Sequence, residues 1–177
     1  MTWNNFYKDK LNDKYLNYIK TKYTPYIEVV KSSGNSYLEI GCGISSITKL
    51  IYEKNKAFIV TDKDPFMLRL SKLNLKALNV KIKKMDATNP FDIRTDVIHS
   101  HGMLEHLTPN QMKQSIDCSL SQCKTLIHYV PSNKYDYKSY GDELLLSPKE
   151  WKQLVNPTEI IEFNKRYDLI LIWRNHG

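Results

Sequence analysis

The sequence of 177 residues predicts an α/β protein with a doubly wound, mostly parallel sheet and helices on both faces. Three observations indicate this fold class. Five apolar runs alternate with stretches of helical spacing, and two further apolar runs follow as a pair. The first run passes through a glycine turn into a helix. Acidic residues stand at or near the ends of the first three runs, where ligands bind in such sheets.

The composition is typical of a single globular domain. Hydrophobic residues make up 41% of the chain and charged residues 25%. No apolar run approaches the roughly 18 residues that a membrane span needs, and the N-terminus lacks the charged-then-apolar order of a secretory signal. The three cysteines, Cys42, Cys118 and Cys123, form neither a disulfide framework nor a metal-binding pattern. We therefore expect a cytoplasmic protein without a membrane partner.

The formal net charge of +7 raises the question of a nucleic-acid partner. The chain is rich in lysine, but also in Asn, Ile and Tyr, the residues of AT-rich codons, so the genome can account for the bias. One concentrated patch consists of Lys72, Lys76, Lys81, Lys83 and Lys84. Such a patch can contact phosphates, although a solvated helix face and strand edge is the simpler interpretation.

Residues 1–34 are predicted to form an N-terminal helical segment, interrupted at Pro25, ahead of a main domain at residues 35–177. Aromatic residues recur in this segment at a spacing of three to four, which usually marks a packing face. The stripe consists of Trp3, Phe6, Tyr7, Leu11, Tyr15, Tyr18 and Ile19. Because an aromatic segment ahead of a nucleotide-type fold can close over the cleft, the first three members are lid candidates.

The first strand is predicted at Tyr37–Ile40 and runs into a glycine turn at Gly41–Gly43. Glycine tolerates positive φ and has no Cβ that would hold a ligand away from the backbone. The helix that follows presents free N–H groups and the positive end of its dipole. Ser45 and Ser46 stand where nucleotide-binding loops carry a further glycine, but Glu39 adds an acid two residues before the turn. On these residues alone, an ordinary tight turn stays an alternative.

The second strand, Ala57–Thr61, ends at Asp62, which lies 19 residues after Gly43. A carboxylate near this offset can accept hydrogen bonds from both hydroxyls of a ribose. Asp64 and Pro65 then supply the N-cap and the first turn of a helix. The predicted core face of this helix contains Phe66, Leu70, Leu73 and Ala77.

The third strand, Val80–Met85, alternates poorly and is therefore predicted near an edge of the sheet. Asp86 follows it, either as a ligand-binding acid or as a cap of a helix or turn. The fourth strand, Asp96–Ser100, leads through His101–Leu107 into a helix. The start of that helix has the spacing of a capping box, Thr108–Gln111.

The fifth strand is predicted at Thr125–Val130, before a polar, tyrosine-rich loop at residues 132–143. A second capping box at Ser147–Glu150 opens another helix. The last two runs, Ile160–Phe163 and Leu169–Trp173, are predicted to form an antiparallel hairpin. Five strand–helix units and this strand pair complete the doubly wound domain.

At the glycine turn the sequence resembles motif I of the class I methyltransferases that depend on S-adenosylmethionine (SAM). Glu39, Gly41 and Gly43 match its acid, one residue and Gly-x-Gly, whereas Ser45 replaces its last glycine. The order of elements from Tyr37 to Trp173 is similar to that superfamily's Rossmann-like sheet of seven strands, mostly parallel with a reversed C-terminal strand. The stretch HGMLEHL after the fourth strand resembles the methyltransferase type 11 group, many of whose members act on small metabolites.

The resemblance implies SAM as the cofactor and a set of residues that bind it. A carboxylate can accept from the ribose diol, and another can accept from the exocyclic amine of adenine while the next N–H binds a ring nitrogen. The implied residues are Glu39, Gly41, Cys42 and Gly43 for the methionine part, Asp62 and Lys63 for the ribose, Asp86 and Ala87 for the adenine, and Ser100 and Leu104 as further lining.

The resemblance also implies methyl transfer to an oxygen or nitrogen atom of a small metabolite. Positioning and desolvation do most of the work, because the sulfonium already activates the methyl group. A general base is needed only for a protonated nucleophile, and the candidates are His106, Glu105 and His101. Local hydrogen bonding is the alternative role of each. No metal site is predicted, because these histidines and His99 lack a recognisable ligand spacing.

The acceptor pocket is expected to be lined by tyrosines from two parts of the chain. Tyr7 belongs to the N-terminal segment, and Tyr135, Tyr137 and Tyr140 belong to the loop after the fifth strand. This lining favours a small molecule with an apolar or ring portion. The sequence leaves the identity of the acceptor and the oligomeric state open.

Three other functions stay open on the sequence. A nucleic-acid methyltransferase is possible through the lysine patch, but no Asp/Asn-Pro-Pro-aromatic run follows the fourth strand and no Pro-Cys occurs. A nicotinamide-dependent oxidoreductase would need the third glycine and a Tyr-x-x-x-Lys pair after the turn, whereas Tyr18–Lys22 precedes it. A non-catalytic SAM-binding protein is the third alternative, although the acids that would hold the cofactor are all present.

Overall fold

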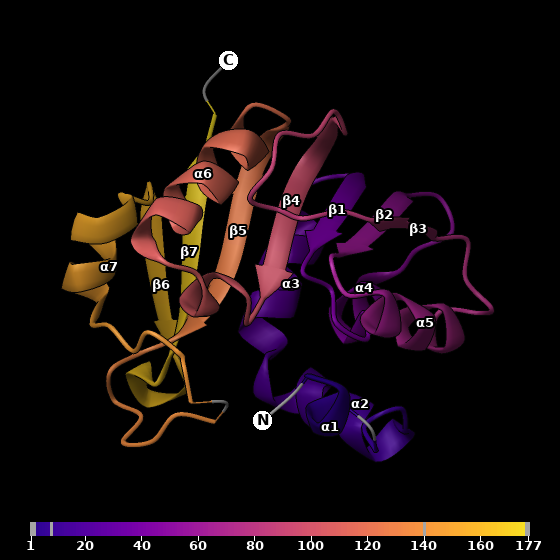
Figure 1. Ribbon diagram of the computed structural model, residues 1–177, viewed down its shortest axis with the longest axis horizontal. Coiled ribbons are helices and arrows are strands. Elements are labelled where there is room, and N and C mark those ends of the chain that lie inside the picture. Colours follow the sequence, from indigo (N-terminus) through magenta and orange to yellow (C-terminus); the bar gives the residue numbers. More distant parts are fainter. Residues whose placement is uncertain (1–2, 8, 140, 176–177) are drawn as a thin grey trace.

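A mixed sheet of seven strands forms the centre of the computed structural model, which describes residues 3–7, 9–139 and 141–175 (Figure 1). In chain order the strands are β1 (Ser36–Ile40), β2 (Ala57–Asp62), β3 (Lys81–Lys84), β4 (Thr95–His101), β5 (Cys123–Pro131), β6 (Glu159–Phe163) and β7 (Asp168–Arg174). The α-helices are α1 (Trp3–Tyr7), α2 (Asp13–Lys22), α3 (Thr24–Ser32), α4 (Ser46–Ile51), α5 (Pro65–Asn74), α6 (Pro109–Leu120) and α7 (Pro148–Val155). Two 3₁₀ turns, η1 (Leu104–His106) and η2 (Asn164–Arg166), complete the described elements.

The strands are arranged in the order β3-β2-β1-β4-β5-β7-β6. β1 pairs in parallel with β2 and β4, and the β2–β3 and β4–β5 pairs are parallel too. β7 is antiparallel to both of its neighbours, β5 and β6. The predicted fold class, a doubly wound seven-stranded sheet with a reversed C-terminal strand, is therefore confirmed, and so is the edge position of β3.

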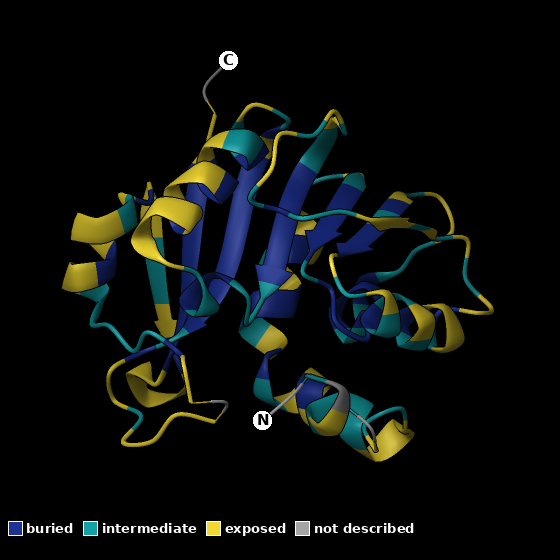
Figure 2. Cartoon of the chain, viewed as in Figure 1, coloured by how far each residue is buried: buried dark blue, intermediate teal, exposed yellow. Residues whose placement is uncertain are grey.

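Helices cover both faces of the sheet, and the alternation along β1 explains the two core layers. Tyr37 belongs to one layer, with residues of α2, α3 and α4, whereas Leu38 belongs to the other, with residues of α6 and α7. Figure 1 shows α6 on the near face of the sheet and α3 on the far face. The central strands are buried over nearly their whole length, while β3 and β6 are partly exposed (Figure 2).

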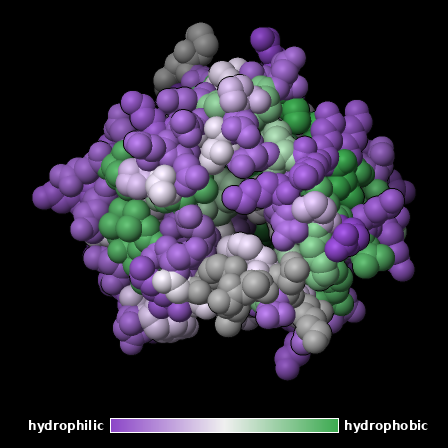
Figure 3. All heavy atoms as spheres, viewed as in Figure 1, coloured by the Kyte–Doolittle hydropathy of each residue, from purple (hydrophilic) through white to green (hydrophobic). Residues whose placement is uncertain are grey.

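The surface in Figure 3 is largely hydrophilic, with separate apolar areas between the charged side chains. In the part of the chain that the structure describes, no helix is long and apolar enough to cross a bilayer.

The N-terminal helical segment consists of three short helices instead of one helix interrupted at Pro25. Pro25 lies in the first turn of α3, where its missing N–H is not needed, and the break falls before it at Tyr23. α2 and α3 contribute Ile19, Tyr26 and Val30 to the core layer beside β1. Residue 34 lies in the turn between α3 and β1. The division of the chain at this residue stays a prediction.

The predicted core face of α5 is wrong. Leu73 is 60% exposed and Ala77 lies beyond the end of the helix, whereas Met67 and Ser71 are buried. The reason is a close approach, because the Ser71 hydroxyl lies 2.6 Å from the Ser45 hydroxyl at the start of α4. A small polar residue fits this approach, so the helix turns its leucine-rich stripe partly outward.

Both predicted capping boxes are confirmed. The Thr108 hydroxyl accepts from the N–H of Gln111, whose side chain accepts from the N–H of Thr108. The Ser147 hydroxyl and the Glu150 carboxylate make the same reciprocal pair at α7. Each box satisfies donors that a helix start leaves without an internal partner.

Candidate functional site

A cavity of about 300 Å³ lies at the carboxyl end of the parallel strands. We call it the first cavity. Six of the residues predicted to bind the cofactor line it, namely Gly41, Gly43, Asp62, Lys63, Asp86 and Ala87. They come from the segments after β1, β2 and β3, which the parallel sheet brings to one edge.

The glycine turn after β1 fits closely under two side chains. Gly41 and Gly43 have φ of 58° and 52°, in the left-handed region. A Cβ on Gly41 would lie 2.7 Å from the Met103 side chain, and one on Gly43 would lie 3.3 Å from the Tyr7 ring. Ser45 also has a positive φ, 57°, so it keeps the backbone conformation of the glycine it replaces. Met103 and Tyr7 therefore pack directly against the turn, and a larger residue at Gly41 would have to displace Met103.

Asp62 fastens this turn to the end of β2. One carboxylate oxygen accepts from the N–H of Gly43 at 3.0 Å, and the other accepts from the N–H of Asp64 at 2.9 Å. Burial raises the pKa of Asp62, while these two hydrogen bonds oppose the rise. The side chain is 9% exposed and lines the first cavity. It can therefore accept further hydrogen bonds only from a ligand that enters this cavity.

Asp86 is a turn cap, as one of its two predicted roles requires, and its role as a ligand-binding acid stays a prediction. Its Oδ1 accepts from the N–H of Thr88 at 3.0 Å and from the hydroxyl of the same residue at 2.8 Å, which is a turn cap. These hydrogen bonds hold the pKa of Asp86 below its ordinary value. The residue also lines the first cavity, next to Ala87.

Four predicted cofactor residues do not line either of the two cavities described here: Glu39, Cys42, Ser100 and Leu104. The Glu39 carboxylate lies behind the turn and accepts from the Thr48 hydroxyl at 2.6 Å. Burial raises its pKa to about 7. Ser100 is turned away from the cavity, and its hydroxyl lies 2.6 Å from Nδ1 of His128. Cys42 and Leu104 are buried in core clusters.

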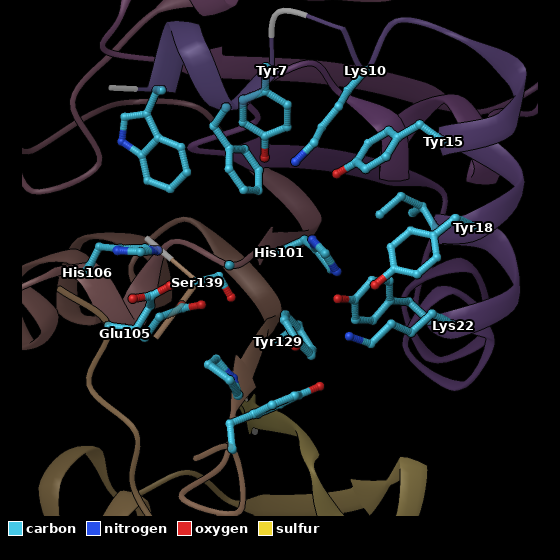
Figure 4. Close-up of a pocket in the computed structure, with 18 of the residues that line it drawn as sticks. Tyr7, Lys10, Tyr15, Tyr18, Lys22, His101, Glu105, His106, Tyr129 and Ser139 are labelled. Carbon is cyan, nitrogen blue, oxygen red and sulfur yellow. The ribbon is translucent and has the colours of Figure 1, made fainter. Parts of the chain in front are cut away.

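A second cavity of about 310 Å³ adjoins the first. The two share Trp3, Tyr7, His101, Gly102 and His106, which form the junction between them. The predicted substrate residues Tyr7, Tyr135 and Tyr137 line the second cavity. Tyr140 lies outside the described residues. Figure 4 shows the side chains of this cavity, with the N-terminal helices on one side and the segment from η1 on the other.

The predicted catalytic residues differ in their surroundings. The His101 ring stacks on Tyr129, with centroids 4.5 Å apart, and meets Tyr23 edge-on at 4.2 Å. Burial lowers its pKa to about 3, so the imidazole is neutral and a weak base at neutral pH. Glu105 is 4% exposed, and burial raises its pKa to about 8. Glu105 is therefore protonated in most of the protein molecules at pH 7.

His106 has the geometry of an oriented base. Its Nδ1 lies 2.6 Å from Oδ1 of Asp142, and its ring meets that of Trp3 edge-on at 5.0 Å. A carboxylate beside one ring nitrogen fixes the orientation and the tautomer of the imidazole. Because His106 lines both cavities, it stands at the junction between them.

Sequence reasoning missed several residues that line these cavities. Met103 and Asp142 line the first, and Lys10 and Lys22 line the second. The acid of the Gly-Asp-Glu stretch after the tyrosine loop was the available signal for Asp142. Lys10 lies within the aromatic stripe and Lys22 follows its last member, Ile19, which could have marked both lysines as its polar border.

Two comparisons of the sequence with known proteins address the family to which this chain belongs. A family model described as a methyltransferase domain matches residues 38–126, half of the chain. No curated protein matches the chain in sequence.

Solved structures show the same fold. The PH0226 protein from Pyrococcus horikoshii OT3 has a TM-score of 0.77 at 13% identity, over 96% of this chain and 98% of that one. DhpI, in a complex with SAH, has a TM-score of 0.73 at 12% identity, over 95% and 92%. The small RNA methyltransferase HEN1 has a TM-score of 0.70 at 17% identity, over 89% of this chain and 25% of that one.

Proposed function

Since this chain belongs to the methyltransferase domain family, we propose that it transfers a methyl group from SAM to an oxygen or nitrogen atom of a small-molecule metabolite. It is a SAM-dependent methyltransferase of the class I superfamily, and the class of acceptor is the proposal. The observation that carries it is the pair of adjoining cavities with a shared junction. One has the residues to hold a nucleoside, and the other is lined with aromatic rings.

The polar groups of the first cavity suit SAM. Asp62 would accept hydrogen bonds from the ribose hydroxyls, and Asp86 with Ala87 would bind the adenine. The turn at Gly41 and Gly43, which line this cavity, would lie against the methionine part, because glycine has no Cβ to hold a ligand away from the backbone. Glu39 would act indirectly, through its hydrogen bonds to Thr48 at the start of α4.

SAM supplies a methyl group on a sulfonium, so that an incoming lone pair forms the new bond to carbon while the carbon–sulfur pair stays on sulfur. The chain would bring the nucleophile to the junction between the cavities and exclude water from it. A hydroxyl or ammonium acceptor also loses a proton, and His106, held by Asp142, would accept it. His101 would contribute a neutral ring at the junction and Glu105 a neutral carboxyl group.

The dimensions of the second cavity favour a small acceptor. Its volume of about 310 Å³ is at the lower end of the usual range for small-molecule sites, roughly 300–1,000 Å³. The rings of Tyr15, Tyr23, Tyr129 and Tyr135 give it mostly aromatic walls. Such walls suit a ring or a short apolar body.

An RNA acceptor is the second candidate function. It is favoured by the three lysines of the edge strand β3, which are exposed, and by the likeness to a protein described as a small RNA methyltransferase. Lysines on an exposed edge can contact phosphates without a pocket.

The test is a transfer assay with methyl-labelled SAM and two acceptor pools, the small-molecule fraction of a cell extract and total RNA. We expect label in the small-molecule fraction, and we expect His106→Gln to lower its incorporation while SAH binding is retained. Label in RNA alone would overturn the proposal in favour of the second candidate. A protein that binds SAH but labels neither pool would be a non-catalytic SAM-binding protein.

A further inference from the structure

Two lysines face the second cavity from the N-terminal helices. Lys10 stands between α1 and α2, and Lys22 ends α2. Figure 4 shows both side chains directed into the space in front of His101 and Tyr129, opposite Glu105 and His106. Lys10 and Lys22 are half-buried, and they line the second cavity but not the first. They are therefore placed to meet the acceptor and not the carboxylate of the cofactor.

Neither lysine has a carboxylate partner. Among the described residues, no carboxylate oxygen lies within 4.0 Å of the Nζ atom of Lys10 or Lys22. Lys10 Nζ instead lies 3.0 Å from the centroid of the Phe6 ring. Burial lowers the pKa of Lys10, which is the effect of a cation removed from water without a counter-charge.

Burial lowers the pKa of Lys22, but Tyr23, a hydrogen bond to Tyr135 and the nearby charge of Asp168 together raise it. Asp168 also has hydrogen-bond partners of its own. The Asp168 carboxylate accepts from the hydroxyl of Tyr129 at 2.7 Å, from that of Tyr135 at 2.9 Å, and from Nδ2 of Asn164 at 2.6 Å. Lys22 Nζ lies among the rings of neighbouring tyrosines, 5.1 Å from the centroid of Tyr23 and 5.5 Å from that of Tyr135. Two positive charges thus border an aromatic cavity with their donors unpaired by any acid.

Glu105 and Glu143 are the acids that line the opposite wall of the second cavity. Glu105 is largely neutral at pH 7, since burial raises its pKa to about 8. The Glu143 carboxylate accepts from the N–H of Gly141 at 2.7 Å, on the loop side of the cavity. The two lysines therefore place positive charge on the side of α2, away from the loop that bears Glu143. A half-buried cation there can be stabilised by an anion that enters with the ligand.

We propose that the methyl acceptor is a small organic anion whose carboxylate or phosphate group binds to Lys10 and Lys22 in the second cavity. This inference rests on the proposed function, because it specifies the acceptor of that reaction. The nucleophilic atom of the acceptor then lies toward His106, which borders both cavities, while the anionic group lies on the side that only the second cavity reaches. The aromatic rings between the two ends hold the body of the molecule.

The test measures the binding of simple anions to the full chain saturated with SAH. The probes are benzoate and phenyl phosphate, with the neutral benzamide for comparison. We expect each anion to bind at least about tenfold more tightly than benzamide, because charge-assisted hydrogen bonds are roughly twice as strong as neutral ones. A stronger response to phenyl phosphate than to benzoate identifies the group as a phosphate, and the reverse order identifies a carboxylate.

The matched variants are Lys10→Met with Lys22→Met, and Lys14→Met with Lys20→Met. Methionine keeps the apolar stem, and Lys14 and Lys20 are exposed residues of α2 that line neither cavity. The first pair should abolish the preference for anions and leave SAH affinity within about twofold, whereas the second pair should change neither. Equal binding of benzoate, phenyl phosphate and benzamide, or a preference that survives the first pair, would overturn the inference. Label found only in RNA would instead contradict the proposed function, so the two failures are distinguishable.

Discussion

At the scale of single residues, the site depends on buried carboxyl groups whose partners differ. Asp62 has two backbone N–H donors, which favour its charged form against the effect of burial. The Oε2 atom of Glu105 has no hydrogen-bond partner among the described residues, and burial raises the pKa of that group to about 8. The first arrangement provides a charged acceptor for a ligand, and the second provides a neutral carboxyl at neutral pH.

Asp62→Asn should weaken SAH binding by at least about tenfold. The amide keeps the size of the side chain but removes its charge, and its NH₂ group would face one of two backbone N–H donors. Calorimetric titration with SAH measures the change. Asp92→Asn, at an exposed position outside both cavities, is the control with the same change of charge. An unchanged dissociation constant in Asp62→Asn would mean that the ribose is held elsewhere.

Glu105→Gln should make stability less dependent on pH. The unfolded chain releases this proton near the ordinary value of 4.5, whereas the folded protein keeps it until about pH 8. The native state therefore binds more protons in between, so the group lowers stability progressively as pH rises through this window. Glutamine cannot ionise and removes this contribution.

Thermal unfolding at pH 5 and pH 8 tests this. We compare the unfolding midpoint of Glu105→Gln with that of the unsubstituted protein at each pH. The difference (variant minus unsubstituted protein) should be at least about 3 °C larger at pH 8 than at pH 5, since 1 kcal/mol corresponds to about 2–4 °C at this size. Repulsion from the neighbouring acids Glu143 and Asp142 also raises the pKa of Glu105. Glu28→Gln, at an exposed position, should show no such trend. A constant difference at both pH values would mean that Glu105 ionises normally in the folded state.

At the scale of elements, the starts of all three helices α5, α6 and α7 are determined by local sequence, whereas the buried face of α5 is not. α6 and α7 begin where their Thr or Ser, Pro and Gln or Glu residues predict, because those contacts lie within one turn. The start of α5 at Asp64 is equally local, and the Asp64 side chain accepts from the N–H of Phe66. The buried face of α5 depends instead on the distant Ser45–Ser71 contact.

Ser147→Ala should lower the free energy of unfolding by about 1 kcal/mol, because it removes the acceptor for the N–H of Glu150. The expected fall in the unfolding midpoint is about 2–4 °C. Ser147→Thr keeps a hydroxyl that accepts from the N–H of Glu150 and donates to the Glu150 carboxylate, so it should retain most of the stability. Equal losses in both variants would show that the cap itself contributes little to α7.

At the scale of the whole molecule, a cofactor bound in the first cavity should stabilise the fold, because this cavity is lined by residues at and after the ends of β1, β2 and β3 together with α1. SAH at about 100 times its dissociation constant adds roughly 2.7 kcal/mol. The unfolding midpoint should therefore rise by about 5–10 °C. NAD, measured in parallel, should give no shift. A shift of the midpoint with NAD but not with SAH would contradict the assignment of SAM as the cofactor.

The sequence by itself determined the doubly wound fold, the glycine turn, and the acids Asp62 and Asp86 at the ends of their strands. These features depend on the alternation of apolar and polar residues, on apolar residues at helical spacing, and on turn residues, which are all local properties of a chain. Parallel strands then bring their carboxyl ends to one edge, so the position of the first cavity followed as well.

Only the tertiary structure decided which side chains face the cavities. It paired His106 with Asp142, 36 residues apart, turned Ser100 toward His128, and directed Lys10 and Lys22 from the N-terminal helices into the second cavity. Such contacts depend on how whole elements pack, and the energy of packing is shared among many residues that no short motif contains.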